Sequence, residues 1–367
     1  MTTIRERMLD AYFGRPREVP PVGIYTRYLP RGDAERIGRD LGLGIIDYYP
    51  VVGMLAPPWH ILPGFLSEVK GAEFSVKTSW REGKPVETRE YRTASGTVSQ
   101  RVEKDAGGIG SEHISRHYIA TPEDYRVMTS IVENTVLSSH EAAFKARKAD
   151  LGGDGVVMAR LDRSPYQKCL IELVGQEQFL LDLYDDPEPA LELMNAIDRR
   201  LDESFDLALR SGAQILWQPD NVTVDMTPPA AFEEHLLPFY RKRARLAREA
   251  GKAYVVHMDG KVKPLRELIE RSGIHVLESV SIAEMGGDLS PEEMGTLFDS
   301  VSVFPNFPSN WCLKGDAELE KLARDFVAQL AGRPCMLQFS EDIPMSEWKR
   351  VYPLVARVVS GYGSGGG

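Results

Sequence analysis

Residues 254–260 read Tyr-Val-Val-His-Met-Asp-Gly, and this stretch indicates the fold more directly than any other. A run of aromatic and β-branched residues is typical of a buried strand, and this run ends at His257. Asp259 and Gly260 follow, and a helical pattern then occupies residues 262–271. Polar residues at the C-terminal end of a strand, directly before a helix, are typical of alternating β/α proteins, where ligand sites lie at that end.

The same alternation of strand and helix patterns extends over most of the chain. Strands are predicted at residues 21–25, 155–160, 214–217, 253–257, 275–278, 301–304 and 335–339. Helices are predicted at residues 33–41, 186–210, 262–271, 316–331 and 346–359, with further helix starts at Thr227 and Ser290. Repeated units of this spacing predict a parallel sheet with right-handed crossovers.

A single (β/α)8 TIM barrel over residues 1–360 is the economical solution for these units, and the fold class is therefore α/β. An open doubly wound sheet is the alternative, but no G-x-G-x-x-G or Walker A pattern supports a nucleotide-binding version. At about residues 70–120 the pattern changes to strands at 74–79, 86–91 and 97–102, which predicts an antiparallel β-hairpin insertion. Residues 361–367 are rich in glycine and are predicted to form a flexible tail.

Composition excludes several classes of function. The chain has 367 residues and a formal net charge of −10, which argues against broad nucleic-acid binding and against docking on an anionic membrane. No stretch approaches the roughly 18 apolar residues of a membrane span. The three cysteines, Cys169, Cys312 and Cys335, form no C-x-x-C pair, so we expect reduced thiols in a cytoplasmic protein.

Four polar residues stand where apolar strands stop, and they are candidate metal ligands. His257 and Asp259 point to the same side if the strand continues through Met258. The alternative is a core histidine hydrogen-bonded to an aspartate that caps the next helix. Glu278 and Glu341 each follow another predicted strand. This repeated placement favours a metal site of imidazole and carboxylate ligands, a set that suits zinc or a harder divalent ion.

Other residues at strand ends are candidates for contacting a substrate. Asp220 could act as an acid or base, orient His257, or cap a turn, and the neighbouring Asn221 could donate to a substrate oxygen or belong to the same turn. Arg27 could clamp an anion or form a loop salt bridge. The aromatic residues at strand ends could be pocket walls or simply core: they are Tyr25, Tyr28, Trp217 and Trp311.

Taken together and in order, several segments resemble the uroporphyrinogen decarboxylase superfamily, which includes the corrinoid-dependent methyltransferases. The segments are residues 91–97, 120–125, 175–177, 185–188, 212–220, 227–232, 257–260 and 341–344. The resemblance implies a (β/α)8 barrel with the active site at its C-terminal mouth. It also implies a homodimer, because members of the family often form dimers.

The departures from the family pattern narrow the expected chemistry. The thiol-activating methyltransferases carry His-x-Cys-Gly and a later cysteine that completes a zinc site. Here Asp259 stands at the first cysteine position, the later position falls near Ser340 and Glu341, and Cys335 comes too early. The arginine-rich motif of the porphyrinogen decarboxylases is only faintly echoed at residues 27–30, which argues against porphyrinogen decarboxylation.

The resemblance and the carboxylate-rich set together predict an O-demethylase-like enzyme. It would move a methyl group from a small O-methylated substrate, aromatic ones included, to the Co(I) of a corrinoid carried by a separate protein. A divalent metal, zinc in the first place, would be held by His257, Glu278 and Glu341, with Asp259 as a ligand or an outer group. Asp220 and Arg27 would orient the substrate. The alternatives are a metal-free decarboxylase or lyase and a non-catalytic barrel that binds a small molecule or a corrinoid protein.

Overall fold

The computed structural model describes residues 2–29, 32–104, 112–341, 343–344 and 346–362. They form two compact units. The first, called the barrel unit below, consists of Met1–Val51, Glu141–Leu161 and Ala208–Gly367. The second unit consists of Val52–His140 and Asp162–Leu207 and contains the predicted insertion at about residues 70–120.

The barrel unit contains eight parallel strands in the order β11-β10-β9-β8-β7-β2-β1-β12. They are β1 (Val22–Tyr25), β2 (Leu43–Tyr49), β7 (Gly155–Arg160), β8 (Ile215–Gln218), β9 (Ala253–His257), β10 (Val276–Val280), β11 (Ser302–Pro305) and β12 (Leu337–Phe339). The two end strands approach each other, because the amide of Phe307 donates to the carbonyl of Gln338 at 2.7 Å. The sheet is thus a nearly closed barrel, and the predicted TIM-barrel fold is confirmed; β2 is the strand that the sequence patterns missed.

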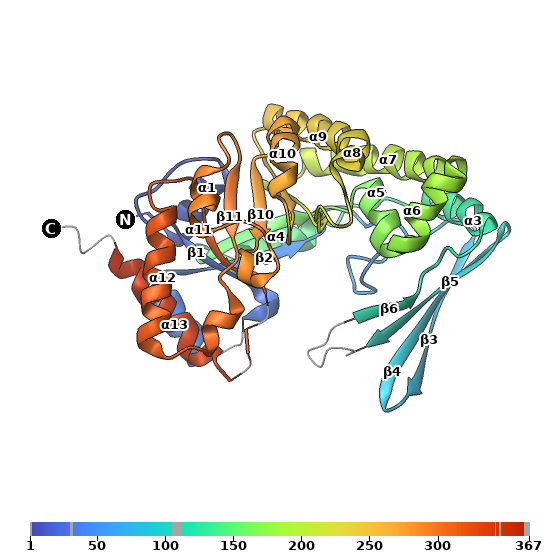
Figure 1. The fold of residues 1–367 in the computed structure, drawn as a ribbon. Coiled ribbons are helices and arrows are strands. Elements are labelled where there is room, and N and C mark those ends of the chain that lie inside the picture. The colour runs from blue at the N-terminus through green and yellow to red at the C-terminus, as the bar shows by residue number, and fades with distance from the viewer. Residues whose placement is uncertain (1, 30–31, 105–111, 342, 345, 363–367) are drawn as a thin grey trace. The chain divides into compact units, whose positions relative to one another are not determined.

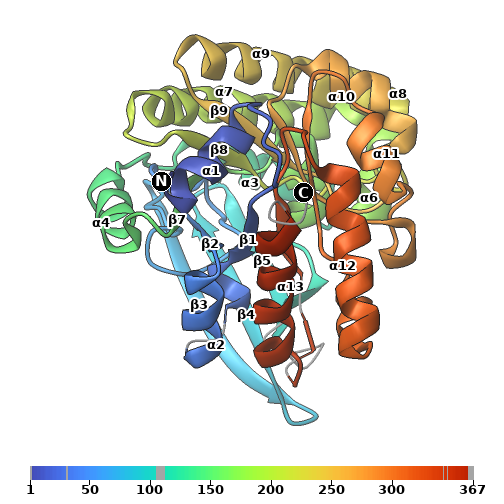
Figure 2. The ribbon, with the colours of Figure 1, turned by 90° about the vertical axis from the view of Figure 1, so that its left-hand side faces the viewer.

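Side chains alternate between the barrel interior and the surrounding helices. Val255, Trp217, Tyr25 and Met336 belong to one buried cluster inside the barrel. The helices of this unit are α1 (Ile4–Tyr12), α2 (Asp33–Asp40), α4 (Glu141–Leu151), α8 (Pro229–Ala231), α9 (Leu237–Glu249), α10 (Arg266–Ser272), α11 (Pro291–Thr296), α12 (Asp316–Leu330) and α13 (Trp348–Tyr362). Figure 2 shows α13 beside α12, and α13 also contacts α2.

Shorter helical segments connect these elements. The 3₁₀ segments are η1 (Thr26–Tyr28), η4 (Lys263–Leu265), η5 (Ala283–Met285) and η6 (Ser309–Leu313), and η3 (Phe232–Leu236) is a π-helix. Local sequence explains the helix ends: Ser290 and Glu293 form a capping box at the start of α11, and Gly273 ends α10 with a positive φ of 70°. The predicted tail at 361–367 is helical up to Tyr362, and the rest of it lies outside the described residues.

The second unit contains an antiparallel sheet in the order β3-β4-β5-β6. The strands are β3 (Ala72–Arg81), β4 (Lys84–Thr93), β5 (Gly96–Lys104) and β6 (Glu112–Arg116). Its helices are α3 (Pro122–Glu133), α5 (Pro165–Gln167), the π-helix η2 (Lys168–Leu173), α6 (Gln176–Asp185) and most of α7 (Pro187–Arg210). Helix α3 packs against β5 (Figure 1), so the predicted antiparallel insertion is confirmed.

None of the helices in the described part of the chain is both long and apolar enough to cross a lipid bilayer. The three cysteines are buried, and none forms a disulfide in these residues.

Candidate functional site

Glu278 is the centre of a hydrogen-bonded cluster inside the barrel, and its side chain is fully buried. Tyr25 on β1 donates its hydroxyl to Oε1 at 2.6 Å. On the other oxygen, Oε2, the indole Nε1 of Trp217 donates at 3.0 Å and Nδ1 of His257 lies at 2.7 Å. Side chains from three strands thus bind this one carboxylate, and their hydrogen bonds offset the free-energy cost of burying it.

His257 lies opposite Glu278 in the register of β9 and β10. Because its Nδ1 is held by Glu278, its Nε2 points the other way, 3.8 Å from Oδ2 of Asp259. Burial alone would lower the pKa of His257, but the charge of Glu278 and hydrogen bonds to both carboxylates raise it to about 10. The structure therefore brings together three of the four predicted ligand residues, with the imidazole between two carboxylates.

Glu341 belongs to a polar strip along the ends of β10, β11 and β12. The hydroxyl of Ser281 donates to its Oε1 at 3.2 Å. Burial and the nearby Asp259 carboxylate raise the pKa of Glu341, although the Ser281 hydrogen bond opposes them. Beside it, Ser279 interrupts β10 with a positive φ of 66° and contacts the hydroxyl of Ser340 at 2.9 Å. A non-glycine residue in that conformation is strained, and such strain often occurs at functional sites.

Aromatic side chains surround the Glu278 cluster. The rings of Tyr48 and Trp217 have centroids 4.9 Å apart, and Tyr25 lies 5.9 Å from Tyr48. The guanidinium of Arg160, at the end of β7, lies 5.4 Å from the Trp217 ring centroid. The sequence patterns place Arg160 at the end of a predicted strand and assign it no function. Its position two residues after Met158, which faces the barrel interior, was the signal that Arg160 lies on the same face.

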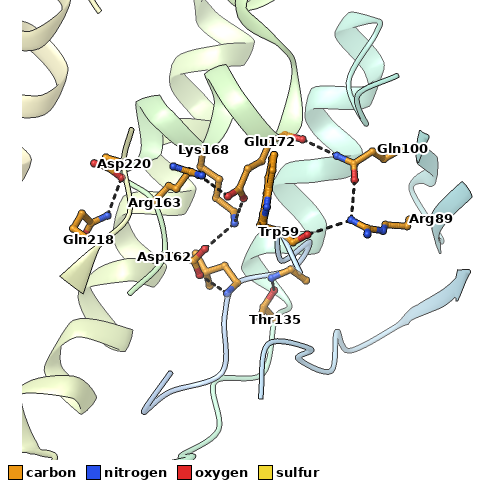
Figure 3. A network of polar contacts seen from close by, with 12 residues as sticks. Trp59, Arg89, Gln100, Thr135, Asp162, Arg163, Lys168, Glu172, Gln218 and Asp220 are labelled. Atoms are coloured by element: carbon orange, nitrogen blue, oxygen red, sulfur yellow. Dashed lines mark hydrogen bonds and ion pairs between the residues drawn. The ribbon is translucent and has the colours of Figure 1, made fainter. Parts of the chain in front are cut away.

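Asp220 and Asn221 follow β8 and have different surroundings. Asp220 is fully buried and accepts from the hydroxyl of Tyr240 on α9 at 2.5 Å and from Gln218 at 3.1 Å, the latter bond drawn in Figure 3. These contacts attach α9 to the outside of the strand. Asn221 has a positive φ of 53°, and its backbone amide donates to the backbone carbonyl of His257 at 2.9 Å. Asn221 therefore lies next to the His257 backbone.

The remaining predicted substrate contacts are more dispersed. Arg27 is exposed in η1, with its guanidinium 5.5 Å from the Tyr28 ring centroid. Tyr28 packs at the edge of the interior cluster. Trp311 lies in η6, where its indole donates to Glu284 at 3.1 Å and it lines a separate cavity of about 350 Å³ beside α12. The contacts described for Trp311 are thus with Phe326 on α12, Glu284 on η5 and the ring of Phe307, and not with the His257 cluster.

Metal-binding capacity depends on how many ligands are in place. Over the described ranges, no three histidine, cysteine, aspartate or glutamate side chains are gathered closely enough to hold a metal ion. His257 and Asp259 have suitable donor atoms, but both oxygens of Glu278 are engaged by Tyr25, Trp217 and His257. The predicted set therefore has donor atoms that suit a divalent metal, but the described residues do not gather three of them around one point. Glu278 is better placed to orient His257 than to bind an ion.

The second unit contains a buried charge cluster that the sequence patterns did not reveal (Figure 3). Lys168 on η2 is fully buried and contacts Asp162 at 2.8 Å and Glu172 at 2.9 Å. Arg163 donates to the other oxygen of Glu172 at 2.9 Å. Asp162 also accepts from the amide of Leu55 at 2.6 Å, so the cluster joins η2 to the segment that begins this unit.

The sequence matches the model of the uroporphyrinogen decarboxylase (URO-D) family over residues 116–334. A structure described as a methyltransferase from Methanosarcina mazei is similar, with a TM-score of 0.57, 14% identity, and coverage of 99% of this chain and 100% of that one. At this identity the likeness supports the fold alone. A D-psicose 3-epimerase in the presence of D-fructose has a TM-score of 0.35 and 9% identity, over 65% of this chain and 85% of that one. No curated protein matches the sequence significantly.

Proposed function

The chain belongs to the uroporphyrinogen decarboxylase family, and from this premise we propose that it is a methyltransferase acting on a small O-methylated substrate. The observation that carries the proposal is the fixed Glu278–His257 pair, with Asp259 3.8 Å from the free side of the imidazole. The similar structure from Methanosarcina mazei is described as a methyltransferase, and the proposal adopts that reaction class for this chain. The methyl acceptor would be the Co(I) of a corrinoid on a partner protein.

Nε2 of His257 and the carboxylates of Asp259 and Glu341 have suitable donor atoms for a divalent ion, zinc in the first place. They would have to close around it, since no three such side chains in the described residues are gathered for a metal. Bound there, it would act as a Lewis acid on the ether oxygen and make the departing alkoxide or phenoxide a better leaving group. Glu278 fixes the tautomer and the orientation of His257 through the 2.7 Å contact to Nδ1. Burial, and after it the neighbouring Asp259 carboxylate, raise the pKa of Glu341, and the charge of a bound cation would oppose both effects.

The protein's own groups would do the positioning. Tyr25 and Trp217 hold Glu278 rigidly from two sides, so that His257 keeps one orientation. The rings of Tyr48 and Trp217 supply an apolar wall for the body of the substrate. Positioning of this kind matters because in-line methyl transfer requires the donor methyl to face the incoming nucleophile.

A methyl-transfer assay with a reduced corrinoid tests the proposal. Wild-type protein loaded with zinc should methylate the corrinoid from a methoxylated aromatic donor, as followed by the absorbance of the methylated form. His257→Ala and treatment with a chelator should each abolish the reaction. His113→Ala is the matched control, since His113 is exposed on β6. Activity that survives both His257→Ala and the chelator would contradict the proposal.

A second candidate, a metal-free decarboxylase or lyase, is favoured by one observation. The raised pKa of His257 keeps the imidazole protonated at neutral pH in the metal-free chain. An imidazolium between two carboxylates can donate a proton to the carbanion that remains after carbon dioxide leaves. Carbon dioxide release that persists in chelator and is lost in His257→Gln would favour this function. Ligand binding without either reaction would indicate a non-catalytic barrel.

A further inference from the structure

Strand β3 lies at one edge of the antiparallel sheet of the second unit, and β6 lies at the other (Figure 1). In the described residues β3 pairs only with β4, and the pairing runs without a register shift from Ala72–Thr93 to Arg81–Lys84. The outer edge of β3 therefore carries a row of main-chain donors and acceptors that no other strand of these residues meets. Such a row is a template for pairing with another chain.

The turn after β3 determines which residues face that edge. Glu82 and Gly83 form a two-residue loop with positive φ angles of 51° and 78°, as in a type I′ turn. The residues that flank such a loop, here Arg81 and Lys84, form a hydrogen-bonded pair, and such pairs alternate with non-hydrogen-bonded ones along antiparallel strands. The odd-numbered residues of β3 thus bond to β4, and the N–H and C=O groups of the even-numbered residues point to the open edge.

The same even-numbered residues carry the exposed apolar side chains of β3. Because side chains alternate along a strand, one face of β3 carries Phe74, Val76, Thr78 and Trp80. Phe74 packs on Tyr91 with ring centroids 4.6 Å apart, but Val76 is 38% exposed and Trp80 is 73% exposed. Exposed apolar side chains that gather along one strand edge are typical of an interaction surface.

The two edges of this sheet differ in how they are protected. In the described residues β6 is 5 residues long, and its pairing with β5 shifts register between Arg101 and Val102. Short strands and bulges are two of the ways in which proteins prevent an edge from pairing. Strand β3 is 10 residues long, contains no proline and pairs evenly with β4. Its edge is therefore open to a further strand.

A second copy of β3 fits this edge. In an antiparallel pair centred on Val76, this residue lies opposite its own copy, Phe74 lies opposite Thr78, and Ala72 lies opposite Trp80. The main-chain groups of all these residues point to the open edge, so each pair can exchange two hydrogen bonds. The apolar row of one copy then continues into that of the other, and Val76 is covered at the two-fold axis.

The charges on the opposite face of β3 favour the same register. With the pair centred on Val76, Lys77 lies opposite Ser75 of the second copy, and Glu73 lies diagonally from Lys77 and Arg81 of the second copy, within reach of long side chains. A pair centred on Lys77 would place two lysines directly opposite each other, which is unfavourable. The charges are thus complementary in one register and repulsive in its neighbour.

We propose that β3 pairs with β3 of a second copy of this chain, antiparallel and centred on Val76, and so joins two four-stranded sheets into one. The inference does not depend on the proposed function. Main-chain hydrogen bonds supply the affinity, and the alternate side chains supply the specificity. Because one strand of each chain contributes, the interface is small, and small interfaces form transient dimers.

Analytical ultracentrifugation of the full-length chain tests the pairing. Between about 1 and 200 μM, wild type should shift from monomer to dimer, as expected of a small interface. Val76→Lys should remain monomeric, since it places two ammonium groups opposite each other at the two-fold axis. Leu181→Lys is the matched control, because Leu181 is also an exposed apolar residue of this unit, on α6, and its replacement should leave the dimer intact.

Val76→Pro gives a second, independent variant. It removes an N–H that points to the open edge and leaves the hydrogen bonds to β4 in place, so it should fold and remain monomeric. Circular dichroism checks the fold of each variant. If Val76→Pro does not fold, Val76→Lys decides, since Val76 is exposed and tolerates a charge.

Single cysteines test the register. Opposite residues of a hydrogen-bonded pair have Cα atoms about 5.5 Å apart, which is within the range of a disulfide. Val76→Cys should therefore form a covalent dimer with diamide as the oxidant, as seen by electrophoresis without reductant. Thr78→Cys is its control, since the two copies of residue 78 lie more than about 13 Å apart in this register. The three native cysteines are buried and should not cross-link.

Several outcomes would overturn the inference. They are a wild type that stays monomeric over the whole concentration range, a dimer that survives both Val76→Lys and Val76→Pro, and a dimer that Leu181→Lys dissociates equally well. Cross-linking of Thr78→Cys as readily as Val76→Cys would contradict the register, and the proposal with it. A monomeric wild type whose β3 edge binds a strand of another protein would assign the edge to a different partner.

Discussion

The proton on His257 decides the charge of the candidate site. With a pKa raised to about 10 by Glu278 and Asp259 against the effect of burial, His257 in the metal-free chain should stay protonated between pH 6 and 8. Since the folded-state pKa lies above the ordinary value of 6.5, the stabilisation is fully present below about pH 6.5 and is lost as the pH approaches 10. Nuclear magnetic resonance of the imidazole nitrogens measures this directly.

Glu278→Gln supplies the matched comparison. Without the carboxylate, burial should lower the pKa of His257 relative to wild type, and the alkaline loss of stability should shift to lower pH. Titration of wild-type His257 near its ordinary pKa would contradict this account of the site.

Gln338 presents a different problem at the residue scale. It is fully buried on β12, and neither its amide nitrogen nor its oxygen has a hydrogen-bond partner in the described residues. A buried polar group left unsatisfied costs about 1–3 kcal/mol. Gln338→Met should therefore raise the free energy of unfolding by about that amount, as measured by urea denaturation.

Gln100 is the matched control for that change. It is also buried, but its amide nitrogen donates to the carbonyl of Glu172 at 3.0 Å and its oxygen accepts from Arg89. Gln100→Met should destabilise the chain, because it leaves those partners unsatisfied. If both methionine variants changed stability in the same direction, the unsatisfied amide would not be the cause.

At the scale of elements, the π-helix η2 depends on the ion pairs of Lys168. Removing one member of a buried pair leaves an uncompensated charge and costs about 3–5 kcal/mol. Lys168→Met should therefore destabilise the second unit by about this amount, since Asp162 and Glu172 lose the same partner. Denaturation followed by circular dichroism measures the loss.

Lys145→Met is its control. Lys145 pairs with Glu141 on α4 but is largely exposed, so its replacement should change stability by less than about 0.5 kcal/mol. Equal effects of the two substitutions would show that burial of the pair is not what matters in η2.

The strands and helices of the barrel were largely predictable because each carries its own signal. Runs such as residues 253–257 are continuous and apolar, as expected of strands covered on both faces. Strand β2 was missed because Gly44 and Asp47 interrupt its apolar pattern directly after α2. The π-helices η2 and η3 have no characteristic sequence period, so tertiary contacts such as those of Lys168 determine them.

The candidate site was predictable in part, for a related reason. A polar residue at a strand end signals the mouth of the barrel, and this placed His257 and Glu278 correctly beside each other. The same rule does not tell which way a side chain turns once the strand has ended. Asp220 turns to Tyr240 on α9, and Trp311 packs toward α12. Arg160 was overlooked because a terminal arginine usually marks the end of a buried segment rather than its interior.

At the scale of the whole molecule, an ion that binds only the folded chain must stabilise it. At a free zinc concentration 100 times the dissociation constant, the gain is about 2.7 kcal/mol, so zinc should raise the melting temperature of wild type and not of His257→Ala. Because His257 is protonated in the metal-free chain, binding must release a proton, and zinc affinity should fall as the pH is lowered. Calorimetry in buffers of different ionisation enthalpy counts that proton. His113→Ala should respond to zinc as wild type does, and an equal shift in His257→Ala would place the ion elsewhere in the chain.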